Sequence, residues 1–264
     1  MTRIIQISDT HLVREGAFAS KTLETATSLK NLVSRISQIQ LEVGLIDAII
    51  VSGDISDDGS SESYERFNTI LSPLKLPVFL VPGNHDIRSA FRSVFSRAGY
   101  LPASGKLNWY QNVGEVHVIG LDTLIEGENA GELDGETLNF LELTLDKLKN
   151  APVILMLHHP PFKTGVKFMD SIGLCKGQDR FRELIGAYPG ELIVVCGHIH
   201  MNIVTQLEGN SVISAPSTCS SFVYNIHNDA PINVLKQEGG LILHDWSHGF
   251  KSIRIDAQRG TAHS

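Results

Sequence analysis

The sequence predicts a layered α/β fold, because apolar strands and amphipathic helices alternate along most of the chain. Short apolar runs rich in β-branched residues recur, and such near-continuous apolarity is typical of strands that are buried on both faces. The expected strands are Ile4–Ile7, Ala48–Val51, Val78–Val81, Val116–Leu121, Val153–Leu157 and Leu192–Val195. Helical patterns separate these runs, as expected for sheets that are covered by helices.

The helices are predicted from apolar spacing and from capping residues. One helix presents a single apolar face made of Leu29, Leu32, Val33, Ile36 and Ile39. Asp134 is the expected N-cap of another helix, whose apolar face is Leu138, Leu141, Leu145 and Leu148. Shorter helices are expected over Ser61–Leu71, Arg88–Ser96 and Gln178–Ile185.

After His200 the pattern changes to short strands separated by turns. These strands are Val204–Leu207, Ser211–Ser214, Ile232–Leu235, Leu241–His244 and Ser252–Ile255. They predict an antiparallel meander that forms a second sheet packed on the first. We expect one domain over residues 1–264, in which residues from about 215 to 264 form a small cap or an oligomer contact. The longer loops at 123–133 and 160–177 are expected to border a functional site.

Composition and charge exclude several classes of protein. The chain has 264 residues, 42% of them hydrophobic and 19% charged, which excludes a disordered chain. A net charge of −7 argues against binding to a nucleic-acid polymer, which needs clustered Lys and Arg. No apolar run approaches the roughly 20 residues that span a bilayer, and the chain opens on a strand instead of a signal peptide. Three scattered cysteines do not form a disulfide framework, so a soluble, cytoplasmic protein is expected.

Polar side chains follow five of the expected strands at the point where each strand ends. They are Asp9 and His11, Asp54, Asn84 with His85 and Asp86, His158 with His159, and His198 with His200. Open α/β sheets place their ligands at this carboxyl edge. Glycines precede Asp54, Asn84 and His198, which allows sharp turns and close backbone approach.

The donor types in this set point to transition metals. Counted as ligands, the residues supply two carboxylates (Asp9 and Asp54), one amide oxygen and four or five imidazoles, which suit Mn, Fe, Zn, Co or Ni. The set is too large for one tetrahedral catalytic zinc, which typically takes about three protein ligands. Two ions that share one bridging carboxylate would use the whole ligand set. Spacing along the chain does not by itself establish such a bridge.

The blocks D-x-H, G-D, G-N-H-D, H and G-H-x-H follow one another in this order between residues 9 and 200. In this order they resemble the calcineurin-like metallophosphoesterases. The run His158–Pro161 and the Met169-Asp170 loop resemble the class III cyclic-nucleotide phosphodiesterases and the bacterial glycerophosphodiesterases within that superfamily. The resemblance implies a four-layer αββα sandwich, with two mixed sheets flanked by helices.

The resemblance also implies a role for each site residue. One metal would be held by Asp9, His11, Asp54 and His200, and the other by Asp54, Asn84, His158 and His198. His85 would protonate the leaving oxygen or stabilise the phosphate, and Asp86 beside it would orient its ring. His159 is interpreted as a residue that supports the ligands from behind or has a structural role. Asp57 and Asp58 are interpreted as a solvated turn.

The implied activity is hydrolysis of a small phosphodiester by a metal-bound hydroxide at a binuclear centre of Mn, Fe, Zn or Co. A 3′,5′-cyclic nucleotide such as cAMP is the leading substrate, and a glycerophosphodiester or a 2′,3′-cyclic nucleotide is the alternative. An inactive binding module of the same fold ranks lower, because every block is filled. A homo-oligomer is compatible with the sequence. Four aromatic residues could stack on a nucleobase but are interpreted as core packing: Phe162, Phe168, Phe222 and Tyr224.

Overall fold

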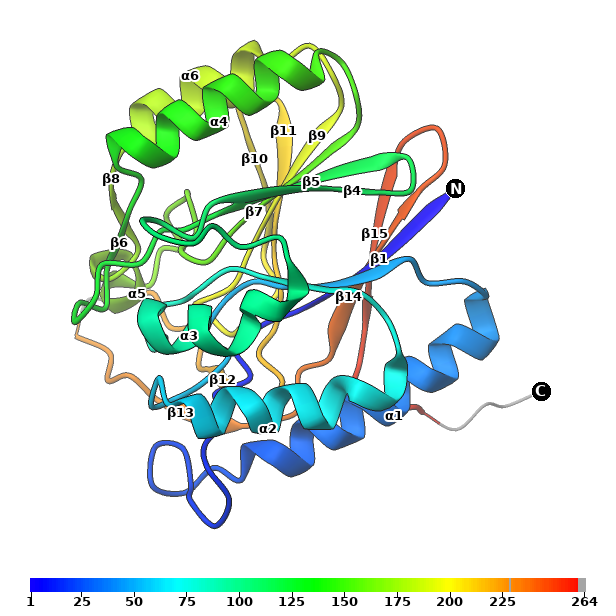
Figure 1. Cartoon of the computed structure of the whole chain (residues 1–264). Coiled ribbons are helices and arrows are strands. Elements are labelled where there is room, and N and C mark those ends of the chain that lie inside the picture. Colours follow the sequence, from blue (N-terminus) through cyan, green and yellow to red (C-terminus); the bar gives the residue numbers. More distant parts are fainter. Residues whose placement is uncertain (228, 261–264) are drawn as a thin grey trace.

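Two mixed sheets lie face to face at the centre of the molecule, with helices on both outer sides (Figure 1). The computed structural model describes residues 1–227 and 229–260. One sheet has the strand order β15-β14-β1-β2-β3, and the other has the order β10-β11-β9-β7-β5-β4. Within the described residues, no helix combines the length and the apolar character needed to cross a membrane.

The first sheet is built around the N-terminal strand. Its strands are β1 (Thr2–Ile7), β2 (Ala48–Val51), β3 (Val78–Leu80), β14 (Leu241–Trp246) and β15 (Phe250–Ile255). β1, β2 and β3 are parallel, whereas β14 and β15 extend the sheet in antiparallel fashion from β1. The outer face is covered by α1 (Thr25–Val43), α2 (Ser61–Leu71) and α3 (Arg88–Phe95). The short 3-10 turns η1 (Ser72–Leu74) and η2 (Ser96–Ala98) end α2 and α3.

The second sheet is mostly parallel. Its strands are β4 (Trp109–Val113), β5 (Val116–Leu121), β7 (Val153–Leu157), β9 (Leu192–Cys196), β10 (Val204–Leu207) and β11 (Asn210–Ser214). Both edge strands, β4 and β10, run antiparallel to their neighbours. The outer face is covered by α4 (Gly135–Leu148) and α6 (Gln178–Ala187). The side chain of Asp134 accepts a hydrogen bond from the Thr137 amide, which confirms Asp134 as the N-cap of α4.

Alternation along the strands explains why two sheets can stack. Ile5 and Ile7 face the helices, whereas Ile4 and Ile50 face the other sheet and pack there with Val118, among others. Each central strand therefore buries both faces, which is what its continuous apolar sequence requires. The four-layer αββα sandwich is confirmed.

One expectation about the fold is wrong. The strands after His200 do not form a separate meander, because β10 and β11 extend the second sheet and β14 and β15 extend the first. β11 pairs in parallel with β9, and β14 pairs with β1 from the opposite end of the chain. Alternating polarity predicts that a segment is a strand, but it does not specify the distant strand with which that segment pairs.

Small elements gather where the parallel strands end. β6 (Gly131–Glu132) pairs with β8 (Leu174–Lys176), which joins the two predicted loops, and α5 (Lys167–Ser171) lies within the second loop. β12 (Ser220–Phe222) pairs with β13 (Val234–Lys236) beside them. Residues 228 and 261–264 of the predicted C-terminal cap lie outside the described residues.

Candidate metal centre

The polar residues that follow β1, β2, β3, β7 and β9 converge on one cavity. This cavity has a volume of about 230 Å³, and its walls include His11, Asp54, Asn84, His198 and His200. All seven predicted ligand positions therefore lie at one edge of the sandwich, as the strand-end pattern predicts. Six of them are buried, and Asn84 is half-buried.

Two groups of donor atoms can be distinguished within the cluster. In the first, the Nε2 atoms of His11 and His200 lie 3.1 Å apart, and His200 Nε2 lies 3.5 Å from Asp9 Oδ1. In the second, Asn84 Oδ1 lies 3.1 Å from His158 Nε2 and 2.9 Å from His198 Nδ1.

Asp54 lies between the two groups. Its Oδ2 atom is 3.7 Å from His11 Nε2 in the first group and 3.4 Å from His158 Nε2 in the second. Its carboxylate therefore lies near donor atoms of both groups. Asp9 also lies within 4.8 Å of donor atoms in each group.

Three imidazoles are oriented by hydrogen bonds at their outer nitrogens. The Nδ1 atom of His11 lies 3.1 Å from Asp57 Oδ1, and that of His158 lies 2.8 Å from the Ser52 carbonyl oxygen. The Nδ1 atom of His200 lies 2.9 Å from Ser220 Oγ. A carboxylate or carbonyl oxygen accepts the Nδ1 proton of His11 and of His158, which makes Nε2 the atom of each ring that is available to bind a cation. This arrangement is typical of histidines that ligate metals.

The electrostatics of the cluster favour a bound cation. Burial would lower the pKa of His11, but its hydrogen bond to Asp57 and the charges of Asp54 and Asp9 raise that pKa to about 9. Burial would likewise lower the pKa of His158, which the charge of Asp54 raises to about 9. Burial would raise the pKa of Asp54, but the charge of His158 and its hydrogen bond hold it well below its usual value. Without metal, the nearby carboxylates therefore keep His11 and His158 protonated. A bound cation would take the place of these positive charges.

His198 supplies a further indication. Its Nε2 atom is buried and has no hydrogen-bond partner among the described residues. Burial lowers the pKa of this imidazole to about 3, so the ring stays neutral and keeps a lone pair. Buried polar atoms without partners are rare, and neutral imidazole nitrogens, carboxylates and an amide oxygen together form a donor set that suits divalent transition metals.

Five of the seven positions have backbone conformations that residues other than glycine rarely adopt. Their φ angles are positive: Asp9 (50°), His11 (44°), Asp54 (48°), His198 (71°) and His200 (52°). Backbone hydrogen bonds between the loops hold this geometry, including those from the Asp9 amide to the Gly53 carbonyl and from the His11 amide to the Asp54 carbonyl. Such concentrated strain is typical of functional sites.

The glycines of the motifs allow the loops to approach closely, as predicted. A Cβ atom at Gly53 would lie 2.3 Å from His158 Nδ1, and one at Gly83 would lie 2.2 Å from Asp54 Oδ1. Neither distance is sterically allowed, so each glycine is required for the adjacent histidine or aspartate to occupy its place.

His85 lies at the rim of the cavity, with 38% of its side chain exposed. Its amide donates a hydrogen bond to Asp54 Oδ1, and its ring lies 4.8 Å from the ring of His11. Its Nδ1 atom donates to the Asp57 carbonyl oxygen at 3.1 Å. The opposite ring nitrogen, Nε2, is therefore the one that can exchange a proton with a ligand.

The predicted contact between Asp86 and the ring of His85 is wrong. The carboxylate of Asp86 instead accepts hydrogen bonds from the amides of Ile55, Ser56 and Gly83 and from the hydroxyl of Tyr64. Asp86 thus ties the loop after β3 to the loop after β2. Burial and the charge of Asp54 raise the pKa of Asp86 to about 6.

The sequence-based interpretation of Asp57 as part of a solvated turn is also wrong. Its carboxylate contacts Nδ1 of His11 at 3.1 Å and lies 3.6 Å from Nδ1 of His85. The sequence pattern does not predict an orienting role for two further residues, Ser52 and Ser220. Only Ser52 carried a local signal, as the neighbour of Gly53 at a strand end.

His159 lies beside the cluster, with its ring centroid 4.7 Å from that of His198, but its ring nitrogens bind elsewhere. Its Nδ1 atom lies 2.8 Å from Thr123 Oγ1, and its Nε2 atom donates to the Asn129 carbonyl at 3.2 Å. Both ring nitrogens are therefore engaged with the loop at 123–133, and burial holds the pKa of His159 well below its usual value.

Comparison with known proteins gives curated relatives at substantial identity. The chain is 30% identical over 244 residues to a probable glycerophosphodiester phosphodiesterase, GpdQ, of Arcobacter nitrofigilis. The match covers 92% of this chain and 88% of that relative. It is 33% identical over 219 residues to the 3′,5′-cyclic adenosine monophosphate phosphodiesterase CpdA of Pseudomonas aeruginosa, over 83% of this chain and 77% of that enzyme.

Solved structures support the fold. The purple acid phosphatase PPD1 from yellow lupin (Lupinus luteus) seeds superposes with a TM-score of 0.67 at 14% identity, over 92% of this chain and 49% of that one. The family model for calcineurin-like phosphoesterases matches residues 2–202, a range that contains every strand end of the cluster. The chain belongs to the calcineurin-like phosphoesterase family.

Proposed function

We propose that this protein is a binuclear-metal-dependent phosphodiesterase whose substrate is a 3′,5′-cyclic nucleotide such as cAMP. The observation that carries the proposal is the convergence of seven nitrogen and oxygen donors in two groups around Asp54, beside an exposed histidine. A structural role for the cluster would not require strained backbones or an unpartnered buried imidazole nitrogen.

In this proposal the two groups of donors hold one cation each. The first cation would be held by Asp9, His11, Asp54 and His200, and the second by Asp54, Asn84, His158 and His198. Mn, Fe, Zn and Co all suit such a donor set. When bound, these cations would make water a nucleophile at neutral pH and offset the charge of the phosphate.

His85 is the proposed general acid. Because its Nδ1 proton is donated to the Asp57 carbonyl, its Nε2 atom is free to carry a proton to the leaving oxygen. Exposure at the cavity rim places this nitrogen where a substrate can reach it. Imidazole is the side chain that most often performs such proton transfer in enzymes.

The relatives support two substrate classes. CpdA of Pseudomonas aeruginosa is named for 3′,5′-cAMP, and the Arcobacter relative for glycerophosphodiesters. Both substrates, like a 2′,3′-cyclic nucleotide, contain the same phosphodiester group, so the alternative is a glycerophosphodiesterase or a 2′,3′-cyclic nucleotide phosphodiesterase.

The segment after residue 215 is proposed to cap the site. Ser220 and Phe222 of β12 and Val234 of β13 line the cavity of the metal centre. A cap here would limit the size of the substrate and reduce its contact with water. An oligomer contact through the same segment stays a prediction.

The test is a substrate panel on protein that has been stripped with chelator and reloaded separately with Mn²⁺, Fe²⁺, Zn²⁺ or Co²⁺. We expect metal-dependent hydrolysis, with the highest kcat/KM for 3′,5′-cAMP among 3′,5′-cAMP, 2′,3′-cAMP and glycerophosphoethanolamine. A higher value for either competitor would favour the corresponding alternative. Inactivity of the folded protein towards these compounds and bis(p-nitrophenyl) phosphate with every metal would contradict the enzymatic proposal.

A further inference from the structure

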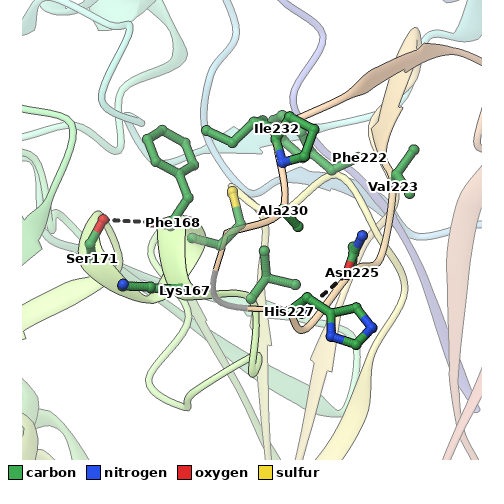
Figure 2. A pocket seen from close by; sticks show the side chains of 12 residues that line it. Lys167, Phe168, Ser171, Phe222, Val223, Asn225, His227, Ala230 and Ile232 are labelled. Carbon is green, nitrogen blue, oxygen red and sulfur yellow. Dashed lines mark hydrogen bonds between the residues drawn. The ribbon is translucent and has the colours of Figure 1, made fainter.

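A second pocket adjoins the cavity of the metal centre, and the proposed function gives it no role. It has a volume of about 440 Å³ and lies between α5 and the facing residues 222–227 and 230–232 (Figure 2). In Figure 2, Phe168 and Ser171 project from α5, while Phe222, Asn225 and Ile232 come from the facing segment.

The two cavities share one wall. Phe168, Met169 and Phe222 line both the pocket and the cavity of the metal centre. The ring centroid of Phe222 lies 4.9 Å from that of His200, one of the candidate ligands. A substrate whose phosphate lies among the donor atoms would therefore extend its organic part into this pocket.

The pocket walls are aromatic and apolar. Phe168 is 38% exposed and Ile232 is 48% exposed, so these side chains are not part of the core. The prediction that Phe168 packs in the core is wrong, whereas Phe162 does pack against the core beneath the second sheet. Exposed apolar side chains that surround a pocket beside a polar centre are typical of a ligand site.

The polar groups of the pocket are few. Lys167, Ser171, Asn225 and His227 contribute polar side chains to the lining, and no carboxylate lines the pocket among the described residues. The lining is therefore compatible with an anionic substrate. Its combination of apolar walls with isolated amide, hydroxyl, imidazole and ammonium groups fits a flat ring that has apolar faces and polar edges.

This chemistry distinguishes among the candidate substrates. The organic part of a glycerophosphodiester is small and polar, so apolar walls would leave its hydroxyl groups without partners. An alkyl chain would be buried by apolar walls but would use neither the aromatic faces nor the polar groups. A nucleobase uses both, because any base can stack on an aromatic side chain while its edges form hydrogen bonds.

We propose that the pocket between α5 and residues 222–227 and 230–232 is the subsite for the base of a cyclic nucleotide, with Phe168 as a stacking surface. This inference rests on the proposed function, and it makes Phe168 a determinant of specificity between nucleotides and simpler phosphodiesters.

The test compares a phosphodiester that carries a nucleobase with one that carries none. The protein reloaded with Mn²⁺ is assayed on 3′,5′-cAMP and on methyl p-nitrophenyl phosphate, which has no base. Phe168→Ala should lower kcat/KM for cAMP by about 5- to 150-fold, mainly through KM, which is the usual effect of removing a stacked aromatic ring. The loss on methyl p-nitrophenyl phosphate should be at least several times smaller.

Conservative variants separate stacking from apolar burial. Phe168→Tyr keeps the aromatic face and should retain activity on cAMP, whereas Phe168→Leu should not. Leu143→Ala removes an exposed apolar side chain from α4, away from both cavities, and serves as the matched control without effect. Full activity of Phe168→Leu on cAMP would overturn stacking and favour simple apolar burial, as for an alkyl chain.

A binding measurement makes the inference independent of turnover. Calorimetric titration of the wild-type protein with adenosine should show binding that ribose does not show and that Phe168→Ala weakens. Absence of adenosine binding, or equal losses of the Phe168→Ala variant on both substrates, would overturn the base subsite. Inactivity of the wild-type protein on both substrates would instead contradict the proposed function, while adenosine binding would still support the subsite.

Discussion

Oδ1 of Asp57 lies 3.1 Å from Nδ1 of His11, and this contact holds His11 in place within the first group of donors. The same contact helps to raise the pKa of the buried His11 ring. The carboxylate fixes the ring so that its Nε2 atom faces Asp54 and His200. A carboxylate behind a ligating histidine also increases the basicity of that ligand.

Asp57→Ala should therefore weaken metal binding although Asp57 is not itself a proposed ligand. We expect a 10- to 100-fold lower affinity for one of two metal equivalents, as is typical when such an orienting partner is lost. The measurement is a metal titration of the stripped protein. The neighbouring Asp58 provides the control, because its carboxylate accepts hydrogen bonds from Ser60 and Ser63 at the start of α2. Asp58→Ala should lower the stability of the protein and leave its metal affinity unchanged. Equal metal affinity in wild-type and Asp57→Ala would refute the anchoring role.

Asp54→Ala should abolish activity and lower metal content at both positions. The reason is the central place of its carboxylate, with Oδ2 3.7 Å from His11 Nε2 and 3.4 Å from His158 Nε2. Elemental analysis after gel filtration measures the metal content. An active Asp54→Ala protein that retains two full equivalents would show that the carboxylate is not shared.

Asn84→Ala should affect the second group of donors selectively. An amide oxygen is neutral and binds a cation less strongly than a carboxylate does, so this position should be the looser one. We expect one metal equivalent to be lost on dilution and activity to be restored by excess metal. If saturating metal does not restore activity to a folded Asn84→Ala protein, weak binding at this position is the wrong explanation.

His85→Ala should keep both metals and lose rate. General acid catalysis typically contributes about 10²- to 10⁴-fold, and the loss should depend on the leaving group. The alkoxide released from a cyclic nucleotide needs protonation, whereas p-nitrophenolate needs little. The ratio of kcat between variant and wild type on cAMP and on bis(p-nitrophenyl) phosphate measures this difference. Equal losses on both substrates would indicate that His85 positions the phosphate instead.

His244 should make stability fall as the solution becomes acidic. Burial lowers its folded-state pKa from 6.5 to about 3, while its ring nitrogens lie within hydrogen-bond distance of Ser252 and Gln6. The unfolded chain binds a proton below pH 6.5 that the folded chain does not bind until about pH 3. The contribution of His244 to the free energy of unfolding is therefore fully present above pH 6.5. It decreases by up to about 1.4 kcal/mol per pH unit as the pH falls from 6.5 to about 3.

The comparison is with His244→Gln, which cannot titrate. Free energies of unfolding of both proteins, measured in chelator between pH 7.5 and 4.5, should differ in slope below pH 6.5, with the steeper fall in the wild type. Parallel curves would show that His244 is not kept neutral by the fold.

The sequence predicts the architecture and the donor set because both depend on local signals. Apolar runs identify strands that are buried on both faces, and the residue after each run lies at the edge where parallel strands end. Asp134 begins α4 as predicted because a side-chain cap acts within three residues of itself.

Other features depend on contacts between distant segments. Nothing local to β11 or β14 specifies pairing with β9 or β1. Asp57 looks like a turn residue in the sequence, and it becomes an orienting residue only because the loop after β1 brings His11 against it. Asp86 is adjacent to His85 in sequence, yet its side chain turns inward to Tyr64 and the backbone of the neighbouring loop.

The positive φ angles of Asp9, His11, Asp54, His198 and His200 have an evolutionary consequence. Each such residue costs roughly 1–3 kcal/mol relative to a relaxed backbone, and glycine would remove much of that cost. In a lineage that no longer needs the cations, substitutions at these positions would stabilise the fold and would accumulate quickly. Loss of the chemistry would then be hard to reverse, because restoring the motif would mean rebuilding several unfavourable conformations at once.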